Sequence, residues 1–286
     1  MTLSFRPDRR AASALLLSPL LTALPLAARA ATAPPADADG ALLKAVIAGP
    51  QRSAANRARD VYRHPFETLR FFGLKPGQTV IEISPGGGWY TEILAPYLRD
   101  HGHYYAAHNS ATGGSEGARK GRARFEAKLA AEPAVYGHAK VGSMPTEAGF
   151  SDIAPPGGAD LVLTFRNVHN WIEAGNLDDT LRAFYTVLKP GGVLGVEEHR
   201  ATPGTPLAKV IATGYVPVDF LTARARAAGF EPAGASEVNA NAKDTHEHPN
   251  GVWSLPPTLQ GGEVGKAEFL AIGESDRMTL KFVKPR

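Results

Sequence analysis

Apolar and polar positions repeat with two different spacings along most of the chain, and the two spacings predict strands and helices in turn. After residue 76, short apolar or alternating runs predict strands at 79–83, 103–107, 139–143, 159–165, 192–198, 230–238 and 277–283. Apolar residues spaced three and four apart predict helices at 89–99, 116–131, 177–188 and 220–228. Strands that alternate with helices run parallel, so the pattern predicts an α/β fold with a Rossmann-like doubly wound sheet. No helical pattern separates the last two strands, which predicts a mostly parallel sheet with an antiparallel C-terminal strand.

The chain before residue 76 shows no strand pattern. Residues 31–40 are rich in Ala, Pro and Asp and predict a linker. Short helical patterns follow at 41–48, from a cap at Ser53 to residue 62, and from Pro65 to a stop at Gly73. We therefore expect a linker and N-terminal helices over 31–75, followed by one folded domain over 76–286.

The first thirty residues have the pattern of a secretory signal peptide. A basic stretch ending in Arg9 and Arg10 precedes an apolar run that two prolines interrupt, too short to anchor in a membrane. The residues ARA at 28–30 suit a signal peptidase, so cleavage is expected before Ala31, and an uncleaved N-terminal helix is the alternative. We expect a periplasmic protein of a bacterium. The Arg9–Arg10 pair also allows the twin-arginine route, which carries folded proteins.

Removal of residues 1–30 changes the charge balance. The chain has 31 Lys and Arg against 28 Asp and Glu, and the first thirty residues hold four arginines and one aspartate. The remainder therefore carries 27 of each sign. A neutral chain offers no basic surface for polyanions, so we expect a small-molecule substrate, no nucleic acid and no stable membrane insertion. There is no cysteine, which excludes disulfides and thiolate chemistry. The oligomeric state is not indicated.

A glycine-rich turn ends the first predicted strand, in the run VIEISPGGGWYTEIL at 80–94. Ligands bind doubly wound sheets beyond the carboxyl ends of the strands, and glycine lets a ligand approach the backbone. The first amides of the following helix favour negative charge. A tight turn without a ligand is the alternative. A dinucleotide turn fits less well, because Thr91 stands where G-x-G-x-x-G has its third glycine, and no P-loop lysine follows.

The segment EISPGGG at 82–88 resembles the first motif of class I S-adenosylmethionine-dependent methyltransferases, which reads roughly (D/E)-x-G-x-G-x-G, with Ser84 at the first glycine. The runs LKPGQTV and LKPGGVLGVEE and the closing strand are also typical of that family. The runs RHPFETLRFFGLKPG, RNVHNW and ESDRMTLKF are similar to a subgroup of predicted, often exported, bacterial methyltransferases. The resemblance covers nearly all of the chain after residue 30.

The resemblance implies that S-adenosyl-L-methionine is the cofactor, bound at the ends of four strands. The methionine end is expected at the glycine turn, the ribose where the second strand ends, and the adenine after the third. The fourth strand is followed by groups that face the methyl donor. The residues expected to bind the cofactor are Glu82, Gly86, Gly87, Gly88, His108, Asn109, Ser143, Met144, Arg166 and Asn167. Neither His108 nor Asn109 is the acid that the family has at the ribose position.

The densest polar cluster follows the fourth predicted strand, in the run TFRNVHNW at 164–171. His169 is the candidate general base, because imidazole titrates near neutrality. The alternative is a plain helix start capped by an asparagine. The fifth strand ends with Glu198 and His199. Because the fourth and fifth strands should be neighbours, we expect His169 and His199 to flank the transferred methyl group, with Glu198 as the third catalytic residue.

Substrate contacts are expected from two segments. Arg63 and His64 precede the sheet, and Arg63 suits a carboxylate or phosphate, with an internal salt bridge as the alternative. Asn170 and Trp171 complete the polar cluster. Residues 239–262 predict a long loop of the kind that forms lids.

A metal site has one candidate in that loop. Asp244, His246 and His248 have a spacing that a metal ion can use. Nothing in the local pattern orders them, so no metal site is expected.

Three functions stay open at this point. The first is methyl transfer from S-adenosylmethionine to an unidentified small or cell-envelope molecule. The second is a non-catalytic protein that binds a nucleoside or cofactor on a methyltransferase fold. The third is an oxidoreductase that uses the same sheet for a dinucleotide.

Overall fold

Seven strands form one sheet in the order β3-β2-β1-β4-β5-β7-β6 in the computed structural model, which describes residues 1–2, 37–144, 150 and 152–286. Strands β1 to β5 pair in parallel, and β7 runs antiparallel to both β5 and β6. The predicted Rossmann-like doubly wound sheet is thus confirmed. The bounds are β1 Thr79–Ile83, β2 His103–His108, β3 Lys140–Ser143, β4 Ala159–Phe165, β5 Leu188–His199, β6 Glu231–Ser236 and β7 Arg277–Val283.

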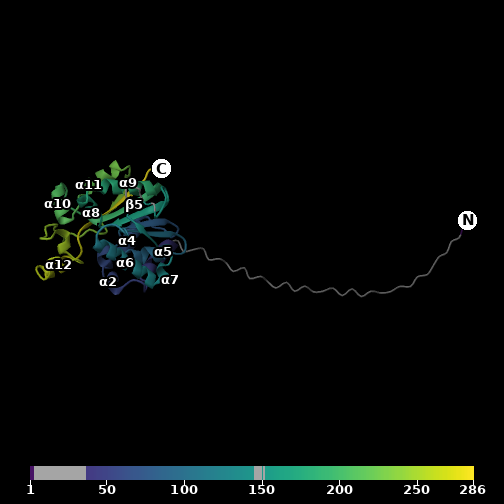
Figure 1. Cartoon of the computed structure of the whole chain (residues 1–286), viewed down its shortest axis with the longest axis horizontal. Coiled ribbons are helices and arrows are strands. Elements are labelled where there is room, and N and C mark those ends of the chain that lie inside the picture. The colour runs from purple at the N-terminus through teal and green to yellow at the C-terminus, as the bar shows by residue number, and fades with distance from the viewer. Residues whose placement is uncertain (3–36, 145–149, 151) are drawn as a thin grey trace. The chain divides into compact units, whose positions relative to one another are not determined.

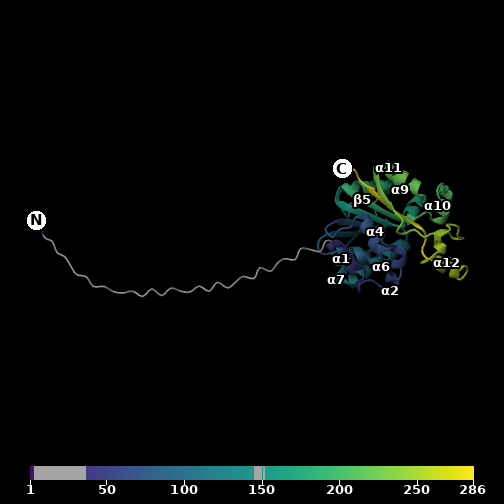
Figure 2. The same cartoon turned by 180° about the vertical axis from the view of Figure 1, so that it is seen from behind.

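Helices cover both faces of the sheet, with α4, α5 and α6 on one side and α9 and α11 on the other (Figures 1 and 2). The helices on the first side are α1 Ala38–Ile47, α4 Pro65–Phe72, α5 Thr91–Leu98, α6 Glu116–Ala131 and α7 Pro133–Tyr136. Those packed on the second side are α8 Val168–Glu173, α9 Leu177–Val187, α10 Leu207–Thr213 and α11 Val218–Ala227. The remaining elements are α2 Ala54–Arg57, α3 Asp60–Arg63, a 3-10 turn η1 Gly251–Ser254 and α12 Lys266–Ile272.

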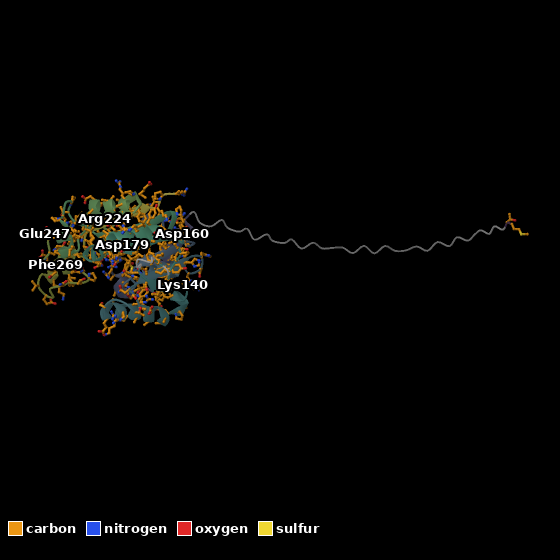
Figure 3. All side chains as sticks on the ribbon, turned by 45° about the horizontal axis from the view of Figure 1, so that its top comes forward. Lys140, Asp160, Asp179, Arg224, Glu247 and Phe269 are labelled. Carbon is orange, nitrogen blue, oxygen red and sulfur yellow. The ribbon has the colours of Figure 1, made fainter. Side chains whose placement is uncertain are left out.

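Both faces of the central strands are buried, which is why those strands read as nearly continuous apolar runs. Val80 of β1 belongs to the core under α5, whereas its neighbour Ile81 belongs to the core under α9. Gly195 of β5 is required by close packing, since a Cβ there would lie 2.7 Å from the ring of Phe72. Asp160, labelled in Figure 3, fixes the edge opposite the site by accepting from the backbone N–H of Thr79 at 2.8 Å.

Several boundaries differ from those the sequence predicts. Helix α1 begins inside the predicted linker, and the helix expected after Ser53 is interrupted between α2 and α3. Helix α12 lies between β6 and β7, where no helix was predicted. Only Phe269 of this helix is buried and Leu270 is exposed, so its apolar spacing is too weak to indicate a helix. Strand β7 is still antiparallel, as predicted.

The predicted signal peptide and most of the predicted linker fall on residues 3–36, outside the described residues. In the part of the chain that the structure describes, no helix has the length and hydropathy needed to cross a bilayer.

Candidate functional site

Two cavities meet where the strand order reverses, beyond the carboxyl ends of β1 and β4. We name the first, of about 410 Å³, the arginine cavity, and the second, of about 480 Å³, the amide cavity. Ser84, Gly86 and Asn167 line both. The arginine cavity is also lined by Arg59, Arg63, Gly87, Trp89, Phe165, Arg166, His169, His199, Trp253, Pro257, Glu274 and Ser275. The amide cavity is also lined by His108, Asn109, Met144, Asn170, Trp171, Ala174, Asn176 and Thr180.

The glycine turn has the backbone shape that its sequence predicts. Ser84, Gly86 and Gly88 have positive φ angles of 48°, 59° and 83°. Ser84 has a Cβ and therefore pays roughly 1–2 kcal/mol for this conformation. A Cβ added at Gly86 or Gly87 would meet no atom within 4 Å, whereas one at Gly88 would lie 3.1 Å from Phe125. Gly86 and Gly87 thus border open space that a ligand can fill, and Gly88 is a packing glycine that lines neither cavity.

Side chains from β2 and α6 hold the carbonyl groups of the turn. His108 Nε2 lies 3.3 Å from the Gly86 oxygen, and Lys128 Nζ donates to the Gly87 oxygen at 3.0 Å. His108 Nδ1 accepts from the backbone N–H of Asn109 at 2.8 Å, so Nε2 carries the proton and donates. Burial lowers the pKa of His108, so the ring is neutral and both its nitrogens are used.

Glu82 lies behind the turn and lines neither cavity. Its Oε2 accepts from Thr91 Oγ1 at 2.8 Å and from Tyr104 OH at 2.5 Å. Burial raises the pKa of Glu82 to about 7, against the effect of these two donors. The carboxyl group therefore braces β1, β2 and α5 beneath the turn, and the structure places no open space beside it for the methionine end of a cofactor.

The described residues that line the amide cavity carry no charge. Its polar groups come mainly from Asn109, Asn170, Asn176 and Thr180, with Trp171 and Met144 as apolar surfaces. In the described residues the side chain of Asn109 has no hydrogen-bond partner, so it is available to a ligand. Asn170 and Trp171, predicted as substrate contacts, lie here among the residues predicted for the cofactor. Ser143 is outside the cavity, where its hydroxyl accepts from Arg122 Nη1 at 3.3 Å.

The predicted catalytic residues are brought together at the rim of β4 and β5. The rings of His169 and His199 are 5.4 Å apart, which confirms the expected proximity. His169 Nδ1 lies 3.0 Å from Glu198 Oε1, and His199 Nδ1 lies 2.6 Å from Ser275 Oγ. Both rings line the arginine cavity. The hydrogen bond to Glu198 occupies Nδ1 of His169 and leaves Nε2 for a ligand.

The pKa values of the two histidines are shifted in opposite directions. Burial opposes a charge on His169, but the Glu198 carboxylate outweighs it and raises the pKa of the ring. Burial lowers the pKa of His199 well below its usual value, and the charge of His169 and Arg166 lowers it further. His169 is therefore the stronger base of the pair, and His199 is a neutral neighbour.

Glu198 has a second set of partners. Its Oε2 accepts from the backbone N–H of Val168 at 2.5 Å and its Oε1 from that of His199 at 2.8 Å. The ligand atoms of His169, Glu198 and His199 lie within 4.8 Å of one another, a spacing that a metal ion can use. The sequence analysis predicts these three residues only as catalytic groups. Its candidate metal ligands lie elsewhere, at Asp244, His246 and His248. There, Asp244 instead accepts from Tyr215 and lies beside His248 Nε2 at 2.8 Å.

A buried network of charges forms the floor of the arginine cavity and extends behind it. Glu274 accepts from Arg59 Nε at 2.6 Å and from Arg63 Nε at 3.0 Å. Glu197 accepts from Arg166 Nη1 at 3.1 Å and from Arg277 Nη1 at 2.8 Å. The salt bridge foreseen as the alternative for Arg63 is thus present, with Glu274 as its partner.

The guanidinium groups outnumber the acids that hold them. Burial acts to raise the pKa of Glu274, but Arg63 and the other arginines lower it to about 2. Burial and the charge of Arg166 lower the pKa of Arg63 to about 9. Nη2 of Arg59 and Nε of Arg277 are buried and have no hydrogen-bond partner among the described residues. Arg166 also has a positive φ of 62°, a strain of the kind that collects at functional sites.

Of the other predicted residues, some line the two cavities and others only support the surrounding structure. His64 Nδ1 lies 3.3 Å from Asn239 Oδ1 and lines a separate pocket, so it is not beside Arg63 in the arginine cavity. Asn167 donates to the Ile83 oxygen at 3.1 Å and so joins β1 to β4. The predicted loop 239–262 reaches the site, where Trp253 and Pro257 form part of the cavity wall.

Sequence reasoning missed a set of residues that only the tertiary fold assembles. They come from α2–α3, the end of the glycine turn, the long loop and the segment before β7: Asn56, Arg59, Trp89, Trp253, Glu274 and Ser275. The one signal in the sequence is the run ESDRMTLKF, which is similar to the exported methyltransferase subgroup but assigns no role to Glu274.

Comparison with solved structures supports the fold. The chain is similar to an S-adenosylmethionine-dependent methyltransferase from Aquifex aeolicus, with a TM-score of 0.53 and 16% identity over 86% of this chain and 98% of that one. It is also similar to the [4+2]-cyclase SpnF, with a TM-score of 0.57 and 20% identity over 86% and 92% of the two chains. A third is an arsenic(III) S-adenosylmethionine methyltransferase from Chlamydomonas reinhardtii, with a TM-score of 0.50 and 12% identity over 86% and 73%.

These neighbours show that the chain has the fold of class I S-adenosylmethionine-dependent methyltransferases. At such low identity they show the fold alone, and one neighbour is named for a different reaction. The chain matches no protein-family model and no curated protein.

Proposed function

We propose that the protein transfers a methyl group from S-adenosylmethionine to a small molecule. The observation that carries the proposal is the position of His169, paired with Glu198, in a cavity that adjoins the open face of Gly86 and Gly87. A cofactor that lies across the turn from the amide cavity would present its reactive end on the side of this base. The fold supports such an arrangement, since doubly wound sheets bind ligands at this edge.

The residues of the amide cavity suit the nucleoside part of the cofactor. Trp171 and Met144 offer apolar surfaces for a base, and the Asn109 amide can donate to and accept from ribose hydroxyls. The open space at Gly86 and Gly87 suits the amino-acid part. Glu82 then supports the cofactor indirectly, by bracing the turn.

The protein contributes position and a base to the reaction. When bound, S-adenosylmethionine supplies a methyl group on a sulfonium centre that is already activated, so alignment and exclusion of water provide most of the rate. His169 Nε2 takes the proton of a hydroxyl or amine acceptor, while Glu198 holds the ring and stabilises its charge. Trp253 and Pro257 line the same cavity and add apolar surface to it.

Calorimetric titration separates the three functions that the sequence leaves open. The purified protein is titrated with S-adenosylmethionine, S-adenosylhomocysteine and NAD, and release of S-adenosylhomocysteine is then measured with a small-molecule extract of the cell envelope. Methyl transfer predicts binding of the first two ligands and turnover with the extract. If titration with S-adenosylmethionine and with S-adenosylhomocysteine gives no heat of binding, the proposal is refuted. Binding of NAD alone would favour the oxidoreductase.

A second candidate is a protein on this fold that binds a nucleoside or cofactor without methyl transfer. It is favoured by the neutral ribose side of the amide cavity, where His108 has both nitrogens engaged and Asn109 replaces an acid. Neutral partners bind less strongly than charged ones. Binding of S-adenosylhomocysteine without turnover by any extract would support this candidate.

The proposal includes export to the periplasm, on the basis of residues 1–30, and an acceptor found in the cell envelope. The cofactor is made in the cytoplasm, so the twin-arginine route would allow a folded protein to leave with cofactor bound. Fractionation and N-terminal sequencing test the location, with Ala31 as the expected first residue. Native mass spectrometry of the periplasmic protein tests whether the cofactor travels with it, and an empty site would argue against that route of supply.

A further inference from the structure

We infer that the methyl acceptor carries an oxyanion, a carboxylate or a phosphate, which binds the guanidinium groups of the arginine cavity. The inference rests on the proposed function, since it identifies the substrate class of the same site. It begins from the charges of the cavity floor. Four guanidinium groups share two carboxylates at and behind this floor. Arg59, Arg63, Arg166 and Glu274 line the cavity, whereas Arg277 and Glu197 are buried behind it.

The excess of positive charge persists when the neighbouring acid is included. Glu198 is a third carboxylate, but it is hydrogen-bonded to His169 and to backbone amides of α8. Buried charges are costly unless they are paired, so an uncompensated guanidinium group in a cavity predicts an anionic ligand. The terminal nitrogens of Arg63 have no hydrogen-bond partner among the described residues, although its Nε is bound by Glu274. The Cζ atom of Arg63 also lies over the ring of Trp89, 4.8 Å from the ring centroid, and this contact helps to orient the guanidinium group.

The carboxylate of the cofactor does not remove this excess. S-adenosylmethionine carries one carboxylate together with an ammonium and a sulfonium group, so its net charge is positive. Binding it next to four guanidinium groups increases the positive charge of the site. A second ligand with a negative group is therefore needed to balance the cavity, and the planar fork of arginine matches both carboxylate and phosphate.

The other residues that line the cavity indicate the size and polarity of the rest of the acceptor. Trp89, Phe165 and Trp253 provide aromatic surface, and the volume of about 410 Å³ suits a small molecule. His169 lines the same cavity as Arg63. An acceptor anchored by its oxyanion therefore presents a hydroxyl or amine group to His169, so the anion positions the nucleophile.

The test measures binding of small aromatic anions to the full protein at pH 7.5 by calorimetry. Benzoate and phenyl phosphate are compared with benzamide, which has the same shape as benzoate and no charge. We expect each anion to bind at least about tenfold more tightly than benzamide, because charge-assisted hydrogen bonds are about twice as strong as neutral ones. The better of the two anions identifies carboxylate or phosphate as the natural group.

Two variants show whether the binding occurs at the arginine cavity. Arg59→Met should weaken anion binding about tenfold, and Glu274 keeps Arg63 and Arg277 as partners, so the fold is retained. Arg70→Met is the control, since Arg70 is exposed on α4 and bound to Asp37 outside both cavities. It should change the affinity less than about twofold.

The titration is repeated with saturating S-adenosylhomocysteine. Undiminished anion binding supports the inference. Mutual exclusion would overturn it, because the guanidinium groups would then serve the carboxylate of the cofactor. Equal affinity for benzoate and benzamide, or an unchanged Arg59→Met variant, would also overturn it. A protein that binds S-adenosylhomocysteine without any preference for anions refutes this inference alone, whereas one that prefers anions but binds no cofactor refutes the proposed methyl transfer.

Discussion

The amide cavity and the arginine cavity meet at Ser84 and Gly86, yet their walls differ in charge. Among the described residues that line the amide cavity, no side chain is ionised, since His108, the one titratable residue of that set, is held neutral. Of the lining residues that the structure describes, the arginine cavity has three guanidinium groups and one carboxylate, Glu274. One cleft therefore combines a neutral half and a positive half.

Under the proposed function, this difference lets a single edge of the sheet distinguish cofactor from acceptor. Neutral amides bind a nucleoside through shape and hydrogen-bond direction, with a modest contribution from each bond. Buried guanidinium groups that outnumber their carboxylate partners favour a ligand of opposite charge, so they select by charge.

Loss of the base should have the largest effect. His169→Asn keeps a hydrogen bond to Glu198 and should lower turnover by about 10²–10⁴-fold, measured as release of S-adenosylhomocysteine with the extract that supports the wild type. Wild-type turnover should fall as the pH drops below the raised pKa of His169, because the protonated ring cannot accept a proton.

Cofactor affinity is the control for that variant and should change less than about twofold. His246→Asn, outside both cavities, should retain wild-type turnover. Full turnover by His169→Asn would remove the base from the proposal.

The carboxyl group behind the neutral half should make stability depend on pH. The pKa of Glu82 is raised from 4.5 to about 7 in the folded protein, so the unfolded chain loses this proton first. Its contribution to the free energy of unfolding is therefore present below pH 4.5 and lost as the pH rises through 7, by on the order of 3 kcal/mol. Denaturant titrations of the wild type and Glu82→Gln check this.

The Glu82→Gln variant should lose this part of the pH dependence, because its amide does not titrate. Glu274 in the positive half has the opposite sign. Its pKa is lowered to about 2, so its contribution is present above pH 4.5 and lost as the pH falls through 2. Identical pH profiles for the wild type and Glu82→Gln would contradict the assignment.

Filling the open face of the turn should block the cofactor without harming the fold. Gly87 does not have a positive φ, and a Cβ there meets no atom. Gly87→Val should therefore weaken S-adenosylhomocysteine binding by at least about tenfold, while the unfolding free energy changes by less than about 1 kcal/mol. Calorimetry and denaturant titration measure the two effects.

Gly117→Val on the exposed surface of α6 is the matched control and should bind as the wild type does. Normal affinity in Gly87→Val would place the cofactor elsewhere.

Adding charge to the neutral half should give a smaller gain. Asn109→Asp restores the acid that the resemblance leads one to expect, and charged acceptors form stronger hydrogen bonds with hydroxyls than amides do. We expect S-adenosylhomocysteine to bind about three- to tenfold more tightly, as measured by calorimetry. Weaker binding would show that Asn109 does not face the ribose.

The strand pattern of this chain could be predicted because it is local. Val80, Ile81 and their neighbours form a run that is apolar on both faces, which is sufficient to indicate a buried parallel strand. The glycine turn and the two histidines followed from the rule that strand ends meet at one edge. Helix α12 was missed because it buries one side chain, Phe269.

The floor of the arginine cavity could not be predicted in this way. Arg59 and Glu274 are 215 residues apart, and their contact depends on the path of α2, α3 and β7 through space. Glu82 shows a second limit. The motif correctly indicated a carboxylate next to the turn, but whether it faces a ligand or the core depends on Thr91 and Tyr104. Local sequence specifies which groups are present, and tertiary packing decides where each one points.

The bond between Arg63 and Glu274 joins positions 211 residues apart. A growing polypeptide has no closed pocket until Glu274 has left the ribosome and joined its partner. The arginine cavity is therefore lined completely only in the finished molecule. If the protein is exported, the compartment in which this last contact forms determines which molecules the pocket first encounters.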